Sequence, residues 1–145
     1  MAIRALYAAA ENFETRQLFN EAYLKWSQIS TRFPTGQPAK DALLGMARNK
    51  YATYRGPAFD SLGIISAKSY YENFRLRYPQ EAQNLKIDEI LKKIDEELAE
   101  KNLLIAQYYE KTGNPEPAAM YNQMVLDKWP DTRAAEEAAK TLKQK

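Results

Sequence analysis

The residues with the clearest potential for chemistry are three pairs of adjacent carboxylates, at Asp88-Glu89, Glu96-Glu97 and Glu136-Glu137. Two carboxyl groups can act as general acid and general base when an apolar pocket makes one of them keep its proton at neutral pH. Each of these pairs lies instead in a strongly charged stretch, with cations about one helical turn away. This arrangement is typical of a solvated helix surface. We therefore predict no catalytic role for these carboxylates.

The sequence contains no histidine and no cysteine. This excludes Ser-His-Asp and Cys-His nucleophilic sites, the usual zinc sites and disulfide bonds. Gly56-Pro57 and Thr35-Gly36 lack the repeated glycines, the lysine and the preceding strand of a phosphate-binding loop. We predict that the protein is not an enzyme and that it uses no cofactor or metal ion.

Charge and hydropathy argue against nucleic-acid binding and against a membrane-spanning segment. The net charge is +2 and the acidic and basic residues are interleaved, so no basic run is present to follow a nucleic-acid backbone. No apolar run reaches the roughly 20 residues that a membrane span needs. The N-terminal stretch MAIRALYAAAENF has neither the apolar core nor the cleavage site of a secretory signal. We expect either a cytosolic protein or one whose signal has been removed.

Three stretches end in the same way, with a cation, an aromatic residue and a proline. They are Ala22–Pro34 (AYLKWSQISTRFP), Ala67–Pro79 (AKSYYENFRLRYP) and Ala118–Pro130 (AAMYNQMVLDKWP), and each begins with an alanine twelve residues before the proline. The alanine allows a partner helix to approach closely, and the residue four positions later lies on the same face. The proline ends the helix and disfavours a helical conformation at the aromatic residue. This pattern is typical of the second helix of a tetratricopeptide repeat.

The sequence therefore predicts an all-α fold, an α-α superhelix or solenoid of about three helical hairpins with a C-terminal capping helix. The prolines are 45 and 51 residues apart, which exceeds the roughly 34-residue period of this repeat and indicates insertions. We interpret residues 1–145 as one domain. Its expected parts are repeat one at 3–34, repeat two at 38–79 with an inserted loop at 56–61, a long helix and repeat three at 81–130, and the capping helix at 132–144.

The stretch from Glu81 to Lys111 contains no helix breaker, so it is either one long helix or two helices joined with little bend. Its i,i+4 pairs Asp88/Lys92, Glu89/Lys93 and Glu97/Lys101 favour an exposed helix surface. A coiled-coil arm is one interpretation and packing inside the array is the other, which we favour because Lys101 and Asn102 interrupt the apolar stripe. Gly113 is the expected stop, Asn114 and Asp131 are expected caps, and Pro115 fits the first position of the following helix.

The sequence contains ten tyrosines, five phenylalanines and two tryptophans, which fit either a ligand groove or helix packing. We assign Phe13, Phe74 and most of the others to packing because their spacing is that of a buried helix face. Tyr7 and Tyr51 stay open between the two. The residues expected to hold the repeats together are Ala22, Trp26, Pro34, Ala67, Tyr71, Pro79, Ala106, Tyr109, Ala118 and Pro130.

The last third of the chain carries a more specific pattern: Ile-Ala, a tyrosine pair, a short turn, two alanines, Trp-Pro and Asp-Thr. These are Ile105, Ala106, Tyr108, Tyr109, Ala118, Ala119, Trp129, Pro130, Asp131 and Thr132. The segment resembles the last repeat of the BamD (YfiO)-type outer-membrane assembly lipoproteins, and the resemblance covers most of Ala67–Leu142. The chain is shorter than is usual in that family and has no lipidated cysteine, as expected if it is the C-terminal part of a longer precursor.

The resemblance implies a non-catalytic adaptor at the periplasmic face of the outer membrane, which helps to bring unfolded β-barrel proteins to their insertion machinery. Its expected partners are outer-membrane assembly components and unfolded β-barrel proteins. The family's substrate groove implies a peptide-binding surface on the first helices here, for which we name Tyr7, Glu11, Arg48 and Tyr51 as candidates. The alternative is a generic repeat scaffold that tethers another complex or an enzyme, in the cell envelope or in the cytoplasm.

Overall fold

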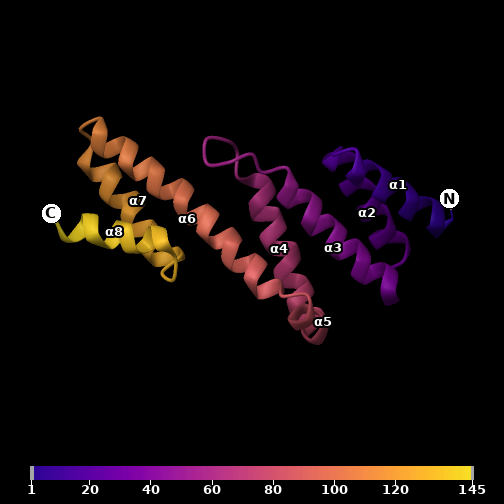
Figure 1. Cartoon of the computed structure of the whole chain (residues 1–145). Helices are drawn as coiled ribbons and strands as arrows, with labels where there is room; N and C mark the ends of the chain where they lie inside the picture. Colours follow the sequence, from indigo (N-terminus) through magenta and orange to yellow (C-terminus); the bar gives the residue numbers. More distant parts are fainter. Residues whose placement is uncertain (1, 145) are drawn as a thin grey trace. The chain divides into compact units, whose positions relative to one another are not determined.

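The computed structural model describes residues 2–144, and those residues form eight α-helices and no β-strand. Each of α1 to α4 packs against the next along the chain, and α7 packs against α8. The helices, labelled in Figure 1, are α1 (Ile3–Thr15), α2 (Phe19–Arg32), α3 (Gly36–Ala52), α4 (Leu62–Arg77), α5 (Pro79–Asn84), α6 (Ile87–Lys111), α7 (Pro115–Lys128) and α8 (Arg133–Lys143). The all-α, tetratricopeptide-like fold class is confirmed.

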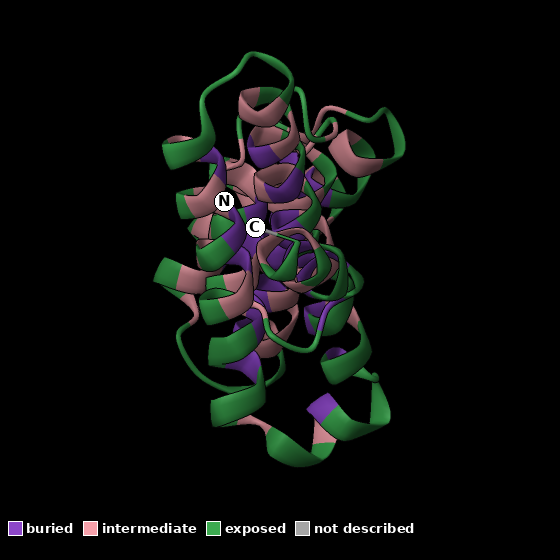
Figure 2. Cartoon of the chain, turned by 90° about the vertical axis from the view of Figure 1, so that its left-hand side faces the viewer, coloured by how far each residue is buried: buried purple, intermediate pink, exposed green. Residues whose placement is uncertain are grey.

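The chain divides into two compact units. Unit 1 contains the residues up to Arg55 together with Asp60–Leu91, and unit 2 contains Gly56–Phe59 and the chain from Lys92 onward. Within each unit, buried residues lie on the inward helix faces and exposed residues on the outer faces and loops (Figure 2). The division of the chain into three repeats stays a prediction.

The three proline stops share one backbone geometry. The aromatic residue before each proline has φ between −135° and −130° and ψ between 60° and 75°, which is not helical. Its N–H still donates to the carbonyl four residues earlier, so the helix ends with that bond satisfied. The three donors are Phe33, Tyr78 and Trp129, and their acceptors are Ile29, Phe74 and Val125.

Small residues lie where the helices touch, as the spacing predicts. Ala22, Ala67, Ala106 and Ala118 have no exposed surface. A larger side chain at any of them would push the partner helix away, because folded interiors are close-packed. Of the larger signature residues, Trp26, Tyr71 and Phe74 are buried, whereas Phe13 and Tyr109 are half-buried.

The stretch from Glu81 to Lys111 is not one continuous helix. α5 ends at Asn84, and α6 begins at Ile87 after Lys86, which has the left-handed φ of +57°. This conformation costs a non-glycine residue about 1–2 kcal/mol. The turn places Ile87 and Ala82 in the core, at 1% and 3% exposure, and their burial offsets that cost. No glycine or proline marks the break, so the sequence pattern could not indicate it.

Two predicted caps are wrong. The N-terminus of α8 is capped by Thr132 and not by Asp131, because the Thr132 hydroxyl accepts a hydrogen bond from the Ala135 N–H at 3.2 Å. The Asn114 side chain does not cap α7 but donates to the Thr112 carbonyl at 3.2 Å.

The predicted turn before α7 is confirmed. Gly113 has φ of +77°, a conformation that glycine adopts without steric cost. Pro115 is the first residue of α7, where its missing N–H leaves no intrahelical bond unmade.

Two charged residues of α6 contact other elements of their unit. Asp88 accepts a bond from Arg75 of α4 at 2.7 Å. Lys101 donates to the carbonyls of Pro57 and Phe59, at 3.0 Å and 2.6 Å, and so holds the loop at 56–59 against α6 within unit 2. These contacts differ from the i,i+4 pairs expected from the sequence.

Candidate functional site

A hollow of about 420 Å³ opens between α1, α2 and α3 of unit 1. Ligand pockets in proteins commonly span about 300–1,000 Å³, so the hollow has room for one or a few side chains of a partner. Its walls combine aromatic rings, an aliphatic side chain and charges of both signs. The lining residues are Tyr7, Glu11, Glu14, Thr15, Trp26, Asp41, Leu44 and Arg48.

Helical spacing explains how two of the walls form. On α1, Tyr7, Glu11 and Glu14 are four and three residues apart, and on α3, Asp41 and Arg48 are seven residues apart. Residues at these spacings lie on one face of a helix. The sequence therefore aligns one row of polar side chains on each helix, and the packing of α1 and α3 around α2 brings the rows together.

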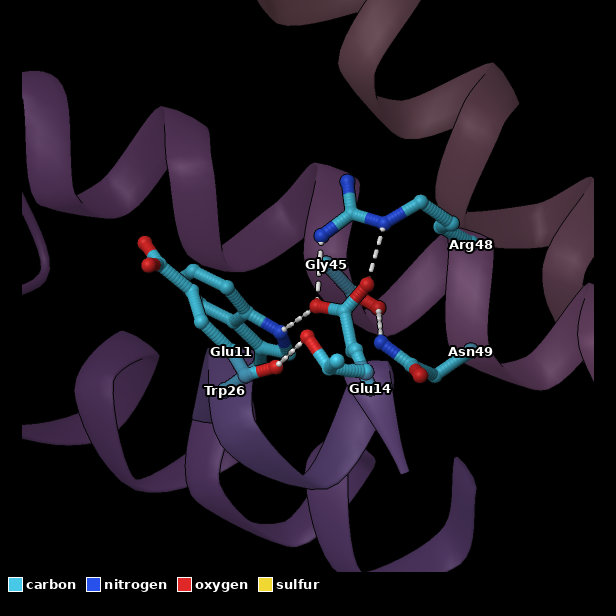
Figure 3. Close-up of polar contacts among 7 residues, drawn as sticks. Glu11, Glu14, Trp26, Gly45, Arg48 and Asn49 are labelled. Carbon is cyan, nitrogen blue, oxygen red and sulfur yellow. Dashed lines mark hydrogen bonds and ion pairs between the residues drawn. The ribbon is translucent and has the colours of Figure 1, made fainter. Parts of the chain in front are cut away.

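Glu14 is the centre of the polar network (Figure 3). The Arg48 Nε and Nη2 atoms both donate to its carboxylate at 2.7 Å, and the Trp26 indole N–H donates to the same group. Burial alone would raise the pKa of Glu14, but the bonds from Arg48 and Trp26 outweigh it and lower that pKa below its ordinary value. The two-pronged contact fixes the Arg48 guanidinium over the hollow.

Gly45 allows α3 to pass directly beside Trp26. A Cβ atom at Gly45 would overlap the indole ring, so no other residue fits at this crossing without a shift. The Arg48 guanidinium carbon lies 5.8 Å from the centroid of the Trp26 ring, within cation–π range. The buried Asn49 amide donates to the Gly45 carbonyl at 2.7 Å (Figure 3).

The Tyr7 side of the hollow is also held in place. The Tyr7 hydroxyl donates to Asp41 at 2.7 Å, and Gln37 donates to the other Asp41 oxygen at 2.9 Å. Burial and the bond to Asp41 raise the pKa of Tyr7 above its ordinary value. Its ring meets the Trp26 ring edge to face, with 5.3 Å between centroids. Tyr7 therefore stays protonated at neutral pH, and it can shape a binding surface but supplies no base.

The structure brings together three of the four residues proposed from the sequence. Tyr7, Glu11 and Arg48 line the hollow, whereas Tyr51 is half-buried and lies outside the lining. Whether a peptide binds there stays a prediction.

Sequence reasoning missed the residues that complete the hollow. Trp26 was assigned to packing alone, yet its ring both packs and lines the hollow. The spacing of Glu14 could have indicated its role, because Glu14 lies twelve residues before Trp26 and Glu110 lies twelve residues before Asn122 in the third repeat. In both pairs the later side chain donates to the glutamate, at 3.3 Å for Asn122 and Glu110.

Among residues 2–144, no group of three or more acidic side chains is arranged to hold a metal ion. Across the same residues, no helix combines the length and apolar character needed to cross a membrane. The geometry of the hollow suits binding, because Glu14 with Arg48 and Tyr7 with Asp41 are already bonded in pairs and no lining residue is a nucleophile beside a base.

Comparison with known families assigns the larger part of the chain. The model of YfiO, the outer membrane lipoprotein family, matches residues 59–145. This stretch contains the second and third proline stops and the Ile105–Ala138 segment, so the resemblance inferred from those residues is confirmed. No curated protein matches the chain. The hollow between α1, α2 and α3 precedes the matched stretch.

Proposed function

The chain belongs to the YfiO family of outer membrane lipoproteins, and we propose that it is a non-catalytic scaffold in outer-membrane β-barrel assembly. In this role it acts at the periplasmic face of the outer membrane and binds extended segments of unfolded β-barrel proteins. The observation that carries the binding proposal is the hollow in which Tyr7, Glu11 and Arg48 meet around Trp26.

The chemistry of the hollow fits a strand of a β-barrel protein before it folds. Such strands alternate apolar and polar residues and carry aromatic residues at the membrane interfaces. Leu44 and the Tyr7 ring offer apolar surface to an aromatic side chain, and the buried Trp26 ring lies behind them. Half of the Arg48 side chain is exposed, so part of it is accessible to a ring of the partner.

Affinity in such a site comes from a few anchor residues and not from the total contact area. The hollow is already ordered by the bonds around Glu14 and Asp41, so a peptide meets a preformed surface and loses little free energy in ordering it. The predicted complex is one aromatic anchor in the hollow, with the rest of the strand lying along α1 and α3.

A direct test uses the purified chain and a fluorescently labelled outer-membrane β-barrel protein, diluted from urea, with binding followed by anisotropy. Leu44→Glu places a carboxylate in the hollow and is expected to weaken binding about tenfold, or about 1.4 kcal/mol. Leu24→Glu is the matched control, because Leu24 is 59% exposed on α2 and does not line the hollow.

Two outcomes would argue against the proposal. Equal binding by the Leu44→Glu and Leu24→Glu variants would show that the hollow is not the binding surface. Equal binding of the β-barrel protein and of an unfolded soluble protein would favour a generic tethering scaffold over a role in barrel assembly.

A further inference from the structure

A second hollow, of about 550 Å³, lies in unit 2 between α6 and α8. None of its residues belongs to the hollow described above, and all of them fall within the stretch that matches the YfiO family. Its lining residues are Lys93, Glu96, Glu97, Glu100, Leu103, Gln107, Arg133, Ala134 and Glu137.

Part of this hollow is formed by positions equivalent to lining positions of the first hollow. The two stretches are aligned on the buried alanine of their first helix, Ala10 in α1 and Ala106 in α6, and on the proline that follows their second helix, Pro34 after α2 and Pro130 after α7. Buried alanines then coincide on α3 and α8, eight residues after each proline, at Ala42 and Ala138. With that register, three pairs of lining residues correspond: Tyr7 with Leu103, Glu11 with Gln107, and Asp41 with Glu137.

The two hollows differ in how far their carboxylates are engaged by neighbouring side chains. Arg48, fourteen residues after Pro34, corresponds to Gln144, fourteen residues after Pro130. In the first hollow Arg48 bonds to Glu14 and Tyr7 bonds to Asp41, so two of its three carboxylates are already engaged. The lining of the second hollow has four carboxylates and two cationic side chains, those of Lys93 and Arg133, and therefore the same excess of two carboxylates as the first.

One of the four carboxylates already has a structural role. Glu96 accepts the backbone N–H of Arg133 at 3.1 Å and 3.2 Å, through its two oxygens, and so completes the N-terminus of α8. Glu100 and Glu137 are exposed, and their carboxylates make no hydrogen bond or ion pair to any described side chain. These two carboxylates are therefore available to a partner without the loss of an internal bond.

We propose that the hollow between α6 and α8 binds the lysine or arginine side chains of an extended segment of a partner protein. Leu103 and Ala134, both buried members of the unit 2 core, give the hollow an apolar floor for the aliphatic stem of such a side chain. Glu100 and Glu137 meet its charged end.

The test uses two labelled synthetic peptides of equal length, built from glycine, serine and leucine. One carries two lysines and the other carries two glutamates at the same positions. In anisotropy titrations of the whole chain, the lysine peptide is expected to bind at least about tenfold more tightly, with an affinity that falls as salt rises. Methyl signals of Leu103 and Ala134 should shift on binding, because these residues form the floor of the hollow.

The variant Glu100→Gln/Glu137→Gln should weaken binding of the lysine peptide about tenfold. The control Glu89→Gln/Glu136→Gln removes the same charge from exposed positions on α6 and α8 outside the hollow, and should change the affinity less than about twofold. Glu136 and Glu137 are adjacent, so the comparison separates helix face from net charge.

Equal affinity for the two peptides would overturn the proposal, and so would an equal loss in the two double variants. The inference does not depend on the function proposed for the first hollow. The Leu44→Glu variant should keep its full affinity for the lysine peptide, so a failure of either hollow is seen separately.

Discussion

The crossing of Gly45 and Trp26 makes the sharpest prediction about how the first hollow is held open. Gly45→Ala should destabilise the protein, although alanine is the better helix former by about 1 kcal/mol. The added Cβ would overlap the indole ring, and Trp26 is only 3% exposed, so the ring has no free space to enter. Overpacking of this kind costs about 1–3 kcal/mol.

The indole cannot turn aside without a further cost. Its N–H donates to the Glu14 carboxylate, and a hydrogen bond to a charged group is worth about 1.5–3 kcal/mol. The clash and the strain on this bond together exceed the gain in helix propensity. We therefore expect Gly45→Ala to lower the free energy of unfolding by about 2 kcal/mol.

A double-mutant cycle with Trp26→Ala tests the cause. That substitution removes the ring atoms that the new Cβ would meet, so Gly45→Ala should then stabilise the protein by about 1 kcal/mol. The change of sign between the two backgrounds is the expected result. The assay is urea unfolding followed by far-ultraviolet circular dichroism, which does not depend on the tryptophan that is being removed.

The reasoning would be refuted if Gly45→Ala stabilised the protein in both backgrounds, or destabilised it equally in both. Either result would mean that α3 does not approach Trp26 as closely as the structure shows. The effect would then be a property of the α3 backbone alone.

Four further changes test other contacts. Glu14→Gln should lower the urea midpoint at about pH 7 more than at about pH 3. The folded state lowers the pKa of Glu14, so the ionised carboxylate stabilises the protein above its ordinary pKa of 4.5, and this stability is lost as the pH falls through the pKa in the folded protein. Thr132→Ala should cost about 1 kcal/mol in chemical denaturation, and Thr132→Ser should restore most of it. Lys101→Met should speed amide hydrogen exchange in the loop at 56–59 while leaving α6 protected. Ala118→Trp should separate α6 from α7, and a circular-dichroism melt matching the wild type would contradict that packing.

The sequence predicts the scaffold well because the scaffold depends on residues whose effects are local. Pro34, Pro79 and Pro130 end helices through their own ring geometry, and Gly113 adopts a left-handed turn at no steric cost. The break at Lys86 escapes such reasoning. A lysine carries no turn signal, and its conformation is set by the burial of Ile87, which is a property of the whole fold.

The candidate site was predictable only in part, for a similar reason. Tyr7, Glu11 and Arg48 could be placed on helix faces from periodicity, and the structure brings them to one hollow. A glycine in the middle of a helix, such as Gly45, has low helix propensity, and only the packing of α3 on Trp26 explains its presence. Tyr51 shares a helix face with Arg48 but lies about 4.5 Å further along the helix axis, beyond the residues of the lining.

Most of the residues that fix the helix packing differ from those that line the hollows, although Trp26, Leu103 and Ala134 do both, and this has a consequence for how the proposed binding surfaces can change. The residues that recur between repeats, such as Ala22 and Ala118, are fully buried and fix the distance between helices. Most residues that line the hollows differ in type between the repeats: Tyr7 corresponds to Leu103, and Arg48 corresponds to Gln144. Mutations at sites with no shared contacts have additive effects. The charge of either hollow can therefore change without altering the helix packing that forms it, so one fold can carry both of the binding surfaces that we propose.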